Sequence, residues 1–323
     1  MTVKLATRRR FLSLIAGGAA AFRSTAALSE TPLTRWTGRV LGADASLTIR
    51  DPDRARAAHA LADCAGEIER IERALSLYRP DSALVQLNGS GELWHPPGEL
   101  VDVMTFASQI SLASDGAFDV TVQPLWDVHV RAHRDMNGFT DALVAARARV
   151  NWRRLQIAKD RIVFTAPQMA ATLNGIAQGY AADRIAERLR SQGFPNVLAD
   201  LGEFRALGER ALGQPWHIGV ARPGNRGLAA SLSLSNNAVA TSSPSGTRFD
   251  ADGTRHHLFD PRSGRSAQGW ASVSVVADTA MRADALSTAI AVAPKAAAET
   301  ILNAGKGQEA VLIDGGRVVR IRA

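Results

Sequence analysis

The most informative part of this chain reads His257-Leu-Phe-Asp-Pro-Arg-Ser-Gly264 and, after a strand rich in valine and serine, Arg282-Ala-Asp-Ala-Leu-Ser-Thr288. Asp284 and Thr288 are four residues apart, so on a helix they stand one turn from each other on the same face. A carboxylate and a hydroxyl placed in this way suit Mg²⁺, which prefers oxygen ligands and usually keeps waters or substrate phosphates in its other positions. The alternative is a pair of surface or capping residues, which Asp and Thr at helical spacing commonly are.

Residues 1–27 are expected to be a cleaved export signal. They contain a twin-arginine pattern, Thr7-Arg-Arg-Arg-Phe-Leu12, then an apolar run to Phe22 and small residues up to Ala27. The apolar run is too short to span a bilayer comfortably. A basic N-terminal helix with a structural role is the alternative. The sequence therefore predicts a soluble periplasmic protein that is exported by the twin-arginine (Tat) machinery, which carries folded proteins.

The net charge of the whole chain, +7, comes mostly from this segment. Residues 1–27 hold five basic residues and no acidic one, so their removal lowers the net charge to +2. A chain so close to neutrality gives no bulk argument for nucleic-acid binding, and we expect no nucleic-acid partner.

Residues 28–323 are expected to form one domain, because no linker rich in Ser, Pro or Gly and no repeat marks a boundary. The hydrophobic pattern mixes strands and helices without strict alternation, which is typical of an α+β fold. Cys64, the only cysteine, falls on the apolar side of the first predicted helix, so we expect a buried thiol. The pattern predicts helices over 55–78, 100–114, 177–192, 282–292 and 295–303, a strand pair over 35–50, strands over 196–201, 217–221, 229–234 and 272–276, and a hairpin over 310–321.

Four local clusters contain residues that can carry chemistry. In the first, Tyr78 follows the first long helix and is either a core residue or a stacking face for a planar ring. In the second, a helix stop at Asp115-Gly116 runs into a short strand. Asp119 stands there among apolar residues, so its carboxylate needs a partner, either as a cap or as a ligand.

The third cluster, Thr172-Leu-Asn-Gly-Ile-Ala-Gln-Gly-Tyr180, is a glycine-bearing turn that opens a helix. Free N–H groups at a helix start attract phosphate, and an exposed carbonyl there can bind a cation, although the two glycines also suit close helix packing. The fourth cluster joins Thr241-Ser-Ser243 to His256-His257 and Asp260. Adjacent histidines on a strand point to opposite sides, so they are not expected to bind one zinc together, and zinc hydrolysis is not favoured.

Taken together, these motifs resemble the ApbE family, the FAD:protein FMN transferases. The resemblance extends from Leu41 to about Gly307. Each motif is short, but their order and spacing together make coincidence improbable. The most specific stretches are Asp115-Gly-Ala-Phe-Asp119, Gly175-Ile-Ala-Gln-Gly-Tyr180, His257-Leu-Phe-Asp-Pro-Arg-Ser-Gly264 and Ala283-Asp-Ala-Leu-Ser-Thr-Ala289.

The resemblance implies the family's α+β architecture as a single catalytic domain, with FAD as substrate and Mg²⁺ as cofactor. Tyr78 would lie against the flavin ring. Mg²⁺ would be bound by the Gly175 carbonyl oxygen, the Asp284 carboxylate and the Thr288 hydroxyl. Ser287 is counted with this metal-binding group, at a position that is acidic in some members. The remaining FAD-lining residues would be Leu41, Ala117, Phe118, Asp119, Thr172, Gln178 and Leu258.

The implied reaction is a Mg²⁺-dependent phosphoryl transfer. A threonine hydroxyl of an acceptor protein, such as a membrane-bound respiratory electron-transfer protein, attacks the FMN-side phosphorus of FAD, and AMP leaves. His257 and Asp284 are the expected catalytic residues: His257 or a nearby carboxylate takes the acceptor proton, and Asp284 holds the metal. Two other classes keep the same site, a pyrophosphatase that splits FAD into FMN and AMP and a non-catalytic FAD-binding protein. A purely structural protein would bind no flavin.

The chain departs from the family pattern at charged positions. Many relatives have an acid and a lysine where this chain has Thr172 and Gln178, so the two losses cancel in charge and FAD contacts become hydrogen bonds. Leu41-Gly-Ala43 stands where relatives commonly have Met-Gly-Thr, which loses a hydroxyl. The Thr172 and Gln178 version also resembles NosX, a branch of periplasmic members tied to nitrous oxide respiration.

Overall fold

The computed structural model describes residues 12–14, 31–224 and 227–323. The export signal predicted over residues 1–27 lies outside these residues, except for 12–14. Within the described part of the chain, no helix is both long and apolar enough to cross a membrane.

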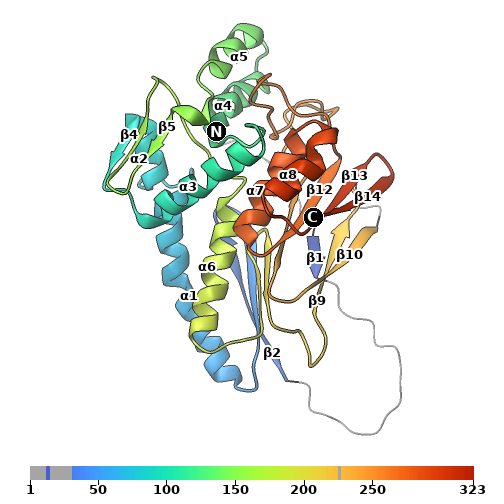
Figure 1. The fold of residues 1–323 in the computed structure, drawn as a ribbon. Coiled ribbons are helices and arrows are strands. Elements are labelled where there is room, and N and C mark those ends of the chain that lie inside the picture. Colours follow the sequence, from blue (N-terminus) through green and yellow to red (C-terminus); the bar gives the residue numbers. More distant parts are fainter. Residues whose placement is uncertain (1–11, 15–30, 225–226) are drawn as a thin grey trace.

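An eight-stranded antiparallel sheet forms the centre of the fold (Figure 1). The strand order is β14-β13-β12-β11-β8-β7-β3-β2, so the chain enters the sheet at one edge and leaves it at the other. Strand β12 is buried along its whole length, as expected for a strand covered on both faces. The strands are β2 (Leu33–Val40), β3 (Ala43–Arg50), β7 (Val197–Asp200), β8 (Phe204–Leu207), β11 (Ala238–Ser242), β12 (Ser272–Ala277), β13 (Glu309–Asp314) and β14 (Arg317–Arg322).

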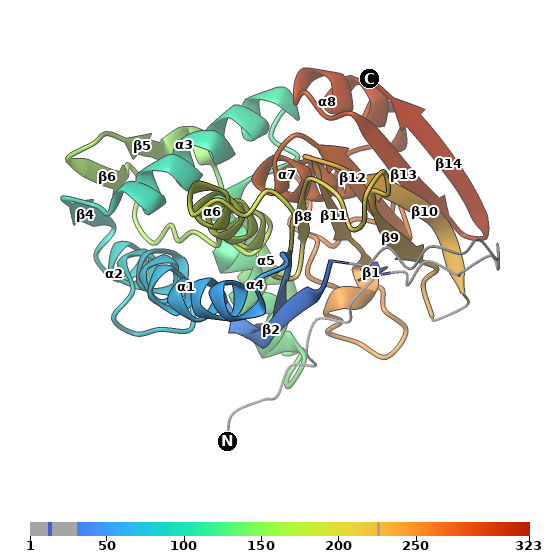
Figure 2. The same ribbon diagram turned by 90° about the horizontal axis from the view of Figure 1, so that it is seen from below.

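Alternate residues of the central sheet belong to two separate cores. In β13, Leu312 belongs to the core that also contains residues of the helices α1 (Arg54–Leu75), α6 (Ala177–Ser191) and α7 (Ala280–Val292), which lie along one side of the sheet (Figure 2). Its neighbours Val311 and Ile313 pack on the opposite side. This alternation follows from the two-residue period of a strand.

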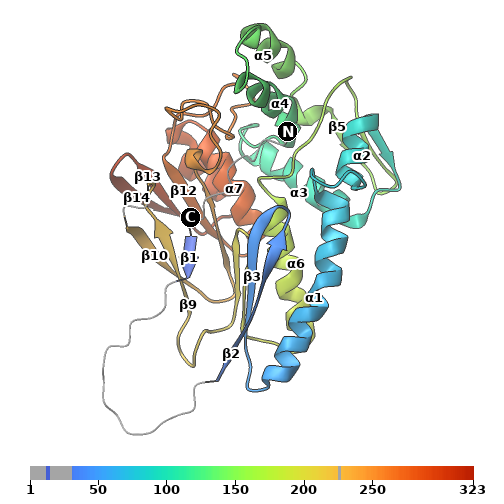
Figure 3. The ribbon, with the colours of Figure 1, turned by 180° about the vertical axis from the view of Figure 1, so that it is seen from behind.

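The second face is covered by a small antiparallel sheet, seen from behind in Figure 3. It consists of β9 (Trp216–Ala221), flanked by β10 (Leu228–Leu234) and by β1 (Leu12–Leu14). Trp216 is fully buried here, and its indole N–H donates to the Leu207 carbonyl at 3.1 Å.

The remaining helices and strands lie outside the central sheet and the helices α1, α6 and α7. A third sheet has the order β4-β6-β5, and the helices α4 and α5 pack together at the top of Figure 1. These peripheral elements are α2 (Ala83–Ser90), β4 (Glu92–Trp94), α3 (Gly98–Ala113), α4 (Gln123–Ala132), α5 (Phe139–Arg147), β5 (Leu155–Ile157), β6 (Arg161–Phe164) and α8 (Ala298–Ala304).

The α+β class predicted from the sequence is confirmed, and most predicted elements are present. Helix α1 ends at Leu75 rather than Tyr78, because Ser76 is extended and its N–H closes the last turn on the Glu72 carbonyl. Cys64 is fully buried, as expected, and burial raises the pKa of its thiol to about 11.

The short strand predicted after Asp119 is wrong. Residues Val120–Val122 form a 3₁₀ turn that leads directly into α4. The cause is local: the Asp119 carboxylate accepts a hydrogen bond from the Thr121 N–H, which caps the turn.

Candidate active site

The start of α6 and the first turns of α7 meet where the sequence predicts the metal. The N–H of Gly179 donates to Asp284 Oδ2 at 3.1 Å. A Cβ at Gly179 would overlap the backbone of Ala280, so the two helices approach this closely only because residue 179 has no side chain. Asp284 is buried in this contact, with an exposure of 3%.

Gly175 approaches the same place from the turn before α6. A Cβ on Gly175 would lie 3.0 Å from Thr288 Oγ1 and 3.5 Å from the Phe118 ring. The structure therefore brings together Gly175, Thr288 and Phe118, which come from three separate motifs of the sequence. A carbonyl, a carboxylate and a hydroxyl are the oxygen ligands that suit a hard cation such as Mg²⁺.

Asp183 fixes the position of α7, a role that the sequence analysis missed because an acid within a helix carries no signal of it. Its Oδ1 accepts from the Ala280 N–H at 2.8 Å and its Oδ2 accepts from the Met281 N–H at 2.9 Å. Arg205 Nε lies 3.3 Å from Oδ1. Burial raises the pKa of Asp183 to about 6, against the two N–H groups and Arg205, which lower it.

Ser242 places a hydroxyl beside the predicted metal-binding residues. It is the last residue of β11, and its Oγ lies 2.8 Å from Ser287 Oγ and 3.1 Å from Thr288 Oγ1. Ser287 in turn donates to the Asp284 carbonyl at 2.9 Å. The sequence motif Thr241-Ser-Ser243 contains this residue, but no spacing rule connects the end of a strand with helix residues more than forty positions later.

His257 lies close to the end of the same strand. Its ring packs against Gly246, in the 3₁₀ turn that follows β11, where a Cβ would lie 2.9 Å from Cε1. Its Nδ1 accepts from the Thr247 N–H at 3.2 Å in one tautomer and donates to the Thr247 carbonyl at 3.3 Å in the other. When Nδ1 donates to that carbonyl, Nε2 carries the lone pair that a general base needs.

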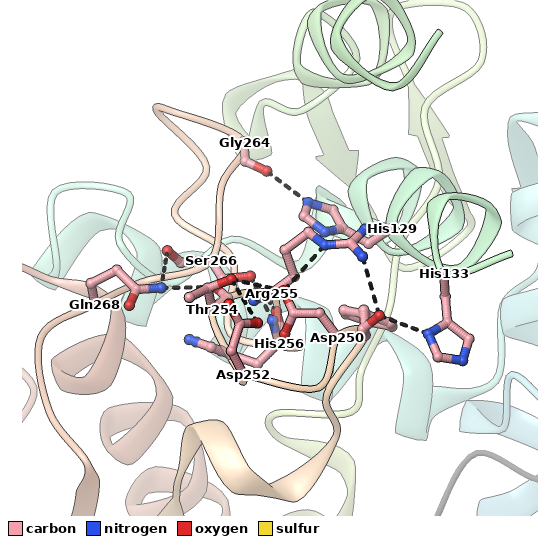
Figure 4. Close-up of polar contacts among 11 residues, drawn as sticks. His129, His133, Asp250, Asp252, Thr254, Arg255, His256, Gly264, Ser266 and Gln268 are labelled. Atoms are coloured by element: carbon pink, nitrogen blue, oxygen red, sulfur yellow. Dashed lines mark hydrogen bonds and ion pairs between the residues drawn. The ribbon is translucent and has the colours of Figure 1, made fainter. Parts of the chain in front are cut away.

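His256 precedes His257 in the same loop, and the His256 N–H donates to Ser266 Oγ at 2.8 Å (Figure 4). Its Nε2 lies 2.7 Å from the Ala267 carbonyl, and its Nδ1 accepts from the Leu258 N–H at 3.3 Å. Burial lowers the pKa of His256 to about 4. The expectation that both histidines lie on one strand is wrong, because His256 makes only an isolated bridge with Arg248.

His129 of α4 and His133, the residue that follows this helix, contact the same loop (Figure 4). His129 is fully buried, with Nε2 3.4 Å from the Gly264 carbonyl, and burial lowers its pKa. His133 Nδ1 lies 2.7 Å from the Phe249 carbonyl. The loop is thus attached to α4 through imidazole contacts at two carbonyls.

Tyr78 is an exposed ring, not a core residue. Its exposure is 67%, and it stands next to the turn between β2 and β3, where a Cβ on Gly42 would lie 3.4 Å from the ring. Leu41 occupies that turn with a left-handed φ of 49° and donates its N–H to Glu72 Oε1 at 2.9 Å. An exposed aromatic ring beside a fixed turn is suited to stack on a planar ligand.

Asp119 uses its carboxylate as a cap. Its Oδ1 accepts from the Thr121 N–H and hydroxyl, both at 2.7 Å, and its Oδ2 accepts from the Trp152 N–H at 3.0 Å. Burial raises the pKa of Asp119. Ala117 and Phe118 precede it and are also buried.

Of the other predicted FAD-lining residues, Thr172 is partly exposed, and Gln178 and Leu258 are buried. Thr172 donates its N–H to the Val120 carbonyl at 2.8 Å, which ties the third sequence cluster to the second. Gln178 is buried against the turn between β7 and β8, where a Cβ on Gly202 would lie 2.6 Å from its Nε2. Leu258 is buried in the main core.

Within the described residues, no three His, Cys, Asp or Glu side chains form a group that could hold a metal. A site built from one carboxylate, hydroxyls and a backbone carbonyl would not form such a group. Its oxygen donors fit Mg²⁺, which binds through one or two carboxylates together with substrate phosphates.

Residues 41–313 match the family model described as the ApbE family. The chain belongs to the ApbE family. The family identified from the sequence motifs is confirmed, and with it the enzyme class, FAD:protein FMN transferase.

Curated relatives from several bacteria carry the name FAD:protein FMN transferase. The one from Salmonella typhimurium is 29% identical over 307 residues, which cover 90% of this chain and 82% of that protein. The one from Vibrio cholerae is 31% identical over 235 residues, 70% of each chain.

Solved structures of the family superpose over nearly the whole chain. The flavin transferase ApbE from Vibrio cholerae matches with a TM-score of 0.78 and 25% identity, covering 90% of this chain and 97% of that one. The apo flavinyl transferase ApbE from Pseudomonas stutzeri matches with a TM-score of 0.76 and 26% identity, covering 92% and 96%.

Proposed function

We propose that this ApbE-family enzyme transfers FMN from FAD to a threonine hydroxyl of an acceptor protein, with Mg²⁺ as cofactor and AMP as leaving group. The observation that carries the proposal is the contact of Gly175 with Thr288 beside the buried Asp284. The contact joins the turn before α6 to α7, whose sequence motifs are over a hundred residues apart, and it supports a site built from the Gly175 carbonyl, the Asp284 carboxylate and the Thr288 hydroxyl. The names of the relatives supply the substrate, FAD, and the product, a flavin-bearing protein.

The predicted site residues have different roles. The Gly175 carbonyl, the Asp284 carboxylate and the Thr288 hydroxyl would hold Mg²⁺, with Ser287 next to them. Bound there, the ion would neutralise charge on the FAD pyrophosphate. Tyr78 would stack on the flavin ring. The other FAD-lining residues are those that the motifs predict, Leu41, Ala117, Phe118, Asp119, Thr172, Gln178 and Leu258.

The transfer forms one bond and breaks another. The acceptor oxygen attacks the FMN-side phosphorus as the P–O bond to AMP breaks, and AMP leaves with the bridging oxygen. We assign the acceptor proton to His257 Nε2, which is the accepting nitrogen in the tautomer whose Nδ1–H donates to the Thr247 carbonyl at 3.3 Å. We place the reaction in the periplasm, after Tat export. The acceptor would be a flavoprotein such as a membrane-bound respiratory electron-transfer protein, as the NosX resemblance suggests.

The purified protein, FAD, Mg²⁺ and a candidate acceptor domain test this proposal when the acceptor is weighed by mass spectrometry. A gain of one FMN group supports transfer. Free FMN and AMP would instead indicate a pyrophosphatase, and unchanged FAD would indicate binding alone.

Asp284→Ala is the decisive variant, and Asp278→Ala is its control. Asp278 is an exposed acid just before α7, which pairs with Arg282 at 2.8 Å. We expect Asp284→Ala to abolish Mg²⁺-dependent transfer and Asp278→Ala to retain it. Transfer that survives Asp284→Ala refutes the metal site. His257→Ala tests the base separately: an unchanged rate at saturating FAD and Mg²⁺ would exclude that role.

A further inference from the structure

The direction of the hydrogen bonds around Ser242 follows from counting protons. Ser287 Oγ has one hydrogen, and the Asp284 carbonyl 2.9 Å away can only accept, so Ser287 donates to it. Ser242 must then donate its own hydrogen to Ser287 across 2.8 Å. No hydrogen of Ser242 remains for Thr288, so the 3.1 Å contact between them is a bond that Thr288 donates.

This direction decides which side of the Thr288 oxygen faces a cation. A hydroxyl binds a metal through a lone pair, so its hydrogen must point away from the metal to an acceptor. A threonine in a helix usually gives its hydrogen to the carbonyl four residues earlier, which here belongs to Asp284. Here that carbonyl accepts from Ser287, and the Thr288 hydroxyl donates to Ser242 on β11.

We propose that Ser242 is a positioning residue for the cation: it accepts the Thr288 hydrogen and so turns the Thr288 lone pairs toward the metal. Ser287 in turn accepts the hydrogen of Ser242, and we call the chain from Thr288 through Ser242 to Ser287 the relay. The inference rests on the metal site of the proposed function. It is the hydroxyl counterpart of the outer contacts that orient histidine and carboxylate ligands at other metal sites.

Because the relay is buried, its hydroxyl groups keep the hydrogen-bond direction described above. Ser287 is fully buried, and Ser242 has an exposure of 9%. Water therefore has little access to replace a lost partner, and a Thr288 hydroxyl without Ser242 would return to its own helix.

Binding of Mn²⁺ alone, followed by electron paramagnetic resonance on the purified protein without FAD, tests the relay apart from turnover. For Ser242→Ala we expect the Kd for Mn²⁺ to rise about 10- to 100-fold, the usual range for an outer contact of a metal ligand. Ser242→Thr keeps the hydroxyl and should stay within about threefold of wild type. In transfer assays, the Mg²⁺ concentration for half-maximal rate should rise by the same factor while kcat at saturating Mg²⁺ holds.

Ser274→Ala is the matched control. Ser274 of β12 is fully buried, and its Oγ lies 2.7 Å from Thr241 Oγ1. The variant therefore removes the same kind of hydroxyl contact, made to the residue of β11 that precedes Ser242. We expect it to bind Mn²⁺ like wild type. If Ser242→Ala is too unstable to purify, Ser287→Ala breaks the relay at its next link and should weaken Mn²⁺ binding as well.

The two proposals fail in different ways. Loss of Mn²⁺ binding in Asp284→Ala together with wild-type binding in Ser242→Ala and Ser287→Ala overturns the relay and leaves the metal site standing. Wild-type binding in Asp284→Ala overturns the metal site itself. A rise in Kd for Ser274→Ala equal to that for Ser242→Ala would also overturn the relay, because the effect would then come from β11 as a whole.

Discussion

The buried imidazole of His256 should make the protein lose stability in mild acid. Its Nε2–H donates to the Ala267 carbonyl and its Nδ1 accepts from the Leu258 N–H, so the neutral ring is fully bonded. Protonation would place a second N–H at Nδ1 against the N–H of Leu258. Burial, the main cause, holds the pKa of His256 at about 4, against 6.5 for a free histidine.

The sign and size of this loss of stability follow from the linkage between proton binding and folding. Between pH 6.5 and 4 the unfolded chain binds a proton at residue 256 and the folded chain does not, so stability falls as the pH falls through this window. From pH 7.5 to 4.5 the histidine should lower the free energy of unfolding by about 2.5 kcal/mol. Asp183, with its pKa raised to about 6, acts in the opposite sense: its contribution falls as the pH rises from about 4 to 6. The wild-type profile alone therefore hides the histidine.

The difference between wild type and His256→Gln isolates it. Glutamine keeps a donor for the Ala267 carbonyl and cannot be charged, while Asp183 is the same in both proteins. Urea unfolding at pH 7.5, 6.0 and 4.5 measures the free energy of unfolding for each. The advantage of wild type over the variant should shrink by about 2.5 kcal/mol over this range. A difference that stays constant to within about 0.5 kcal/mol would refute the buried neutral histidine.

Three further outcomes can be checked independently. Tyr78→Ala should raise the KM for FAD with little change in Tm, because the ring is exposed, whereas Tyr78→Phe should keep the KM; an unchanged KM in the alanine variant would exclude stacking. Gly175→Ala should weaken Mn²⁺ binding, since its Cβ would lie 3.0 Å from Thr288 Oγ1, and Gly66→Ala, where a Cβ meets nothing within 4 Å, should not. Cys64, with its pKa raised to about 11, should resist iodoacetamide at pH 8 in the folded protein and react after unfolding; rapid labelling of the folded state would contradict its burial.

The sequence predicted the long elements well because their signals are local. Helix α1 is preceded by Asp53, whose side chain accepts the Arg56 N–H, and its apolar residues recur at helical spacing. By contrast, α4 and α5 were not predicted. Neither has a side-chain cap: α4 follows Val122 and α5 follows Gly138. These two short helices pack on each other, and His129 and His133 attach α4 to the loop at the Gly264 and Phe249 carbonyls. No single window of the sequence contains these contacts.

The candidate site divides in the same way. Asp284 and Thr288 could be paired from helical spacing, and Gly175 joined them only through the family resemblance. Their roles stay predictions, although the structure places Gly175 against Thr288. The contacts of Ser242 and Asp183 with α7 could not be predicted from the sequence, because each residue acts on α7 from another element. A hydroxyl at a strand end and an acid inside a helix carry no sequence signal of such contacts.

The geometry of the metal-binding group depends on how closely α6 and α7 approach each other. Asp183 holds the first two free N–H groups of α7, and Gly179, one turn earlier on α6, gives its own N–H to Asp284. Both contacts link the same two helices, so α7 can neither slide nor rotate without breaking a buried hydrogen bond. Because Gly175 lies four residues before Gly179, in the turn that leads into α6, this link also restricts its distance to Thr288. A site with a single predicted carboxylate ligand can therefore keep its ligands in place through helix packing instead of through charge.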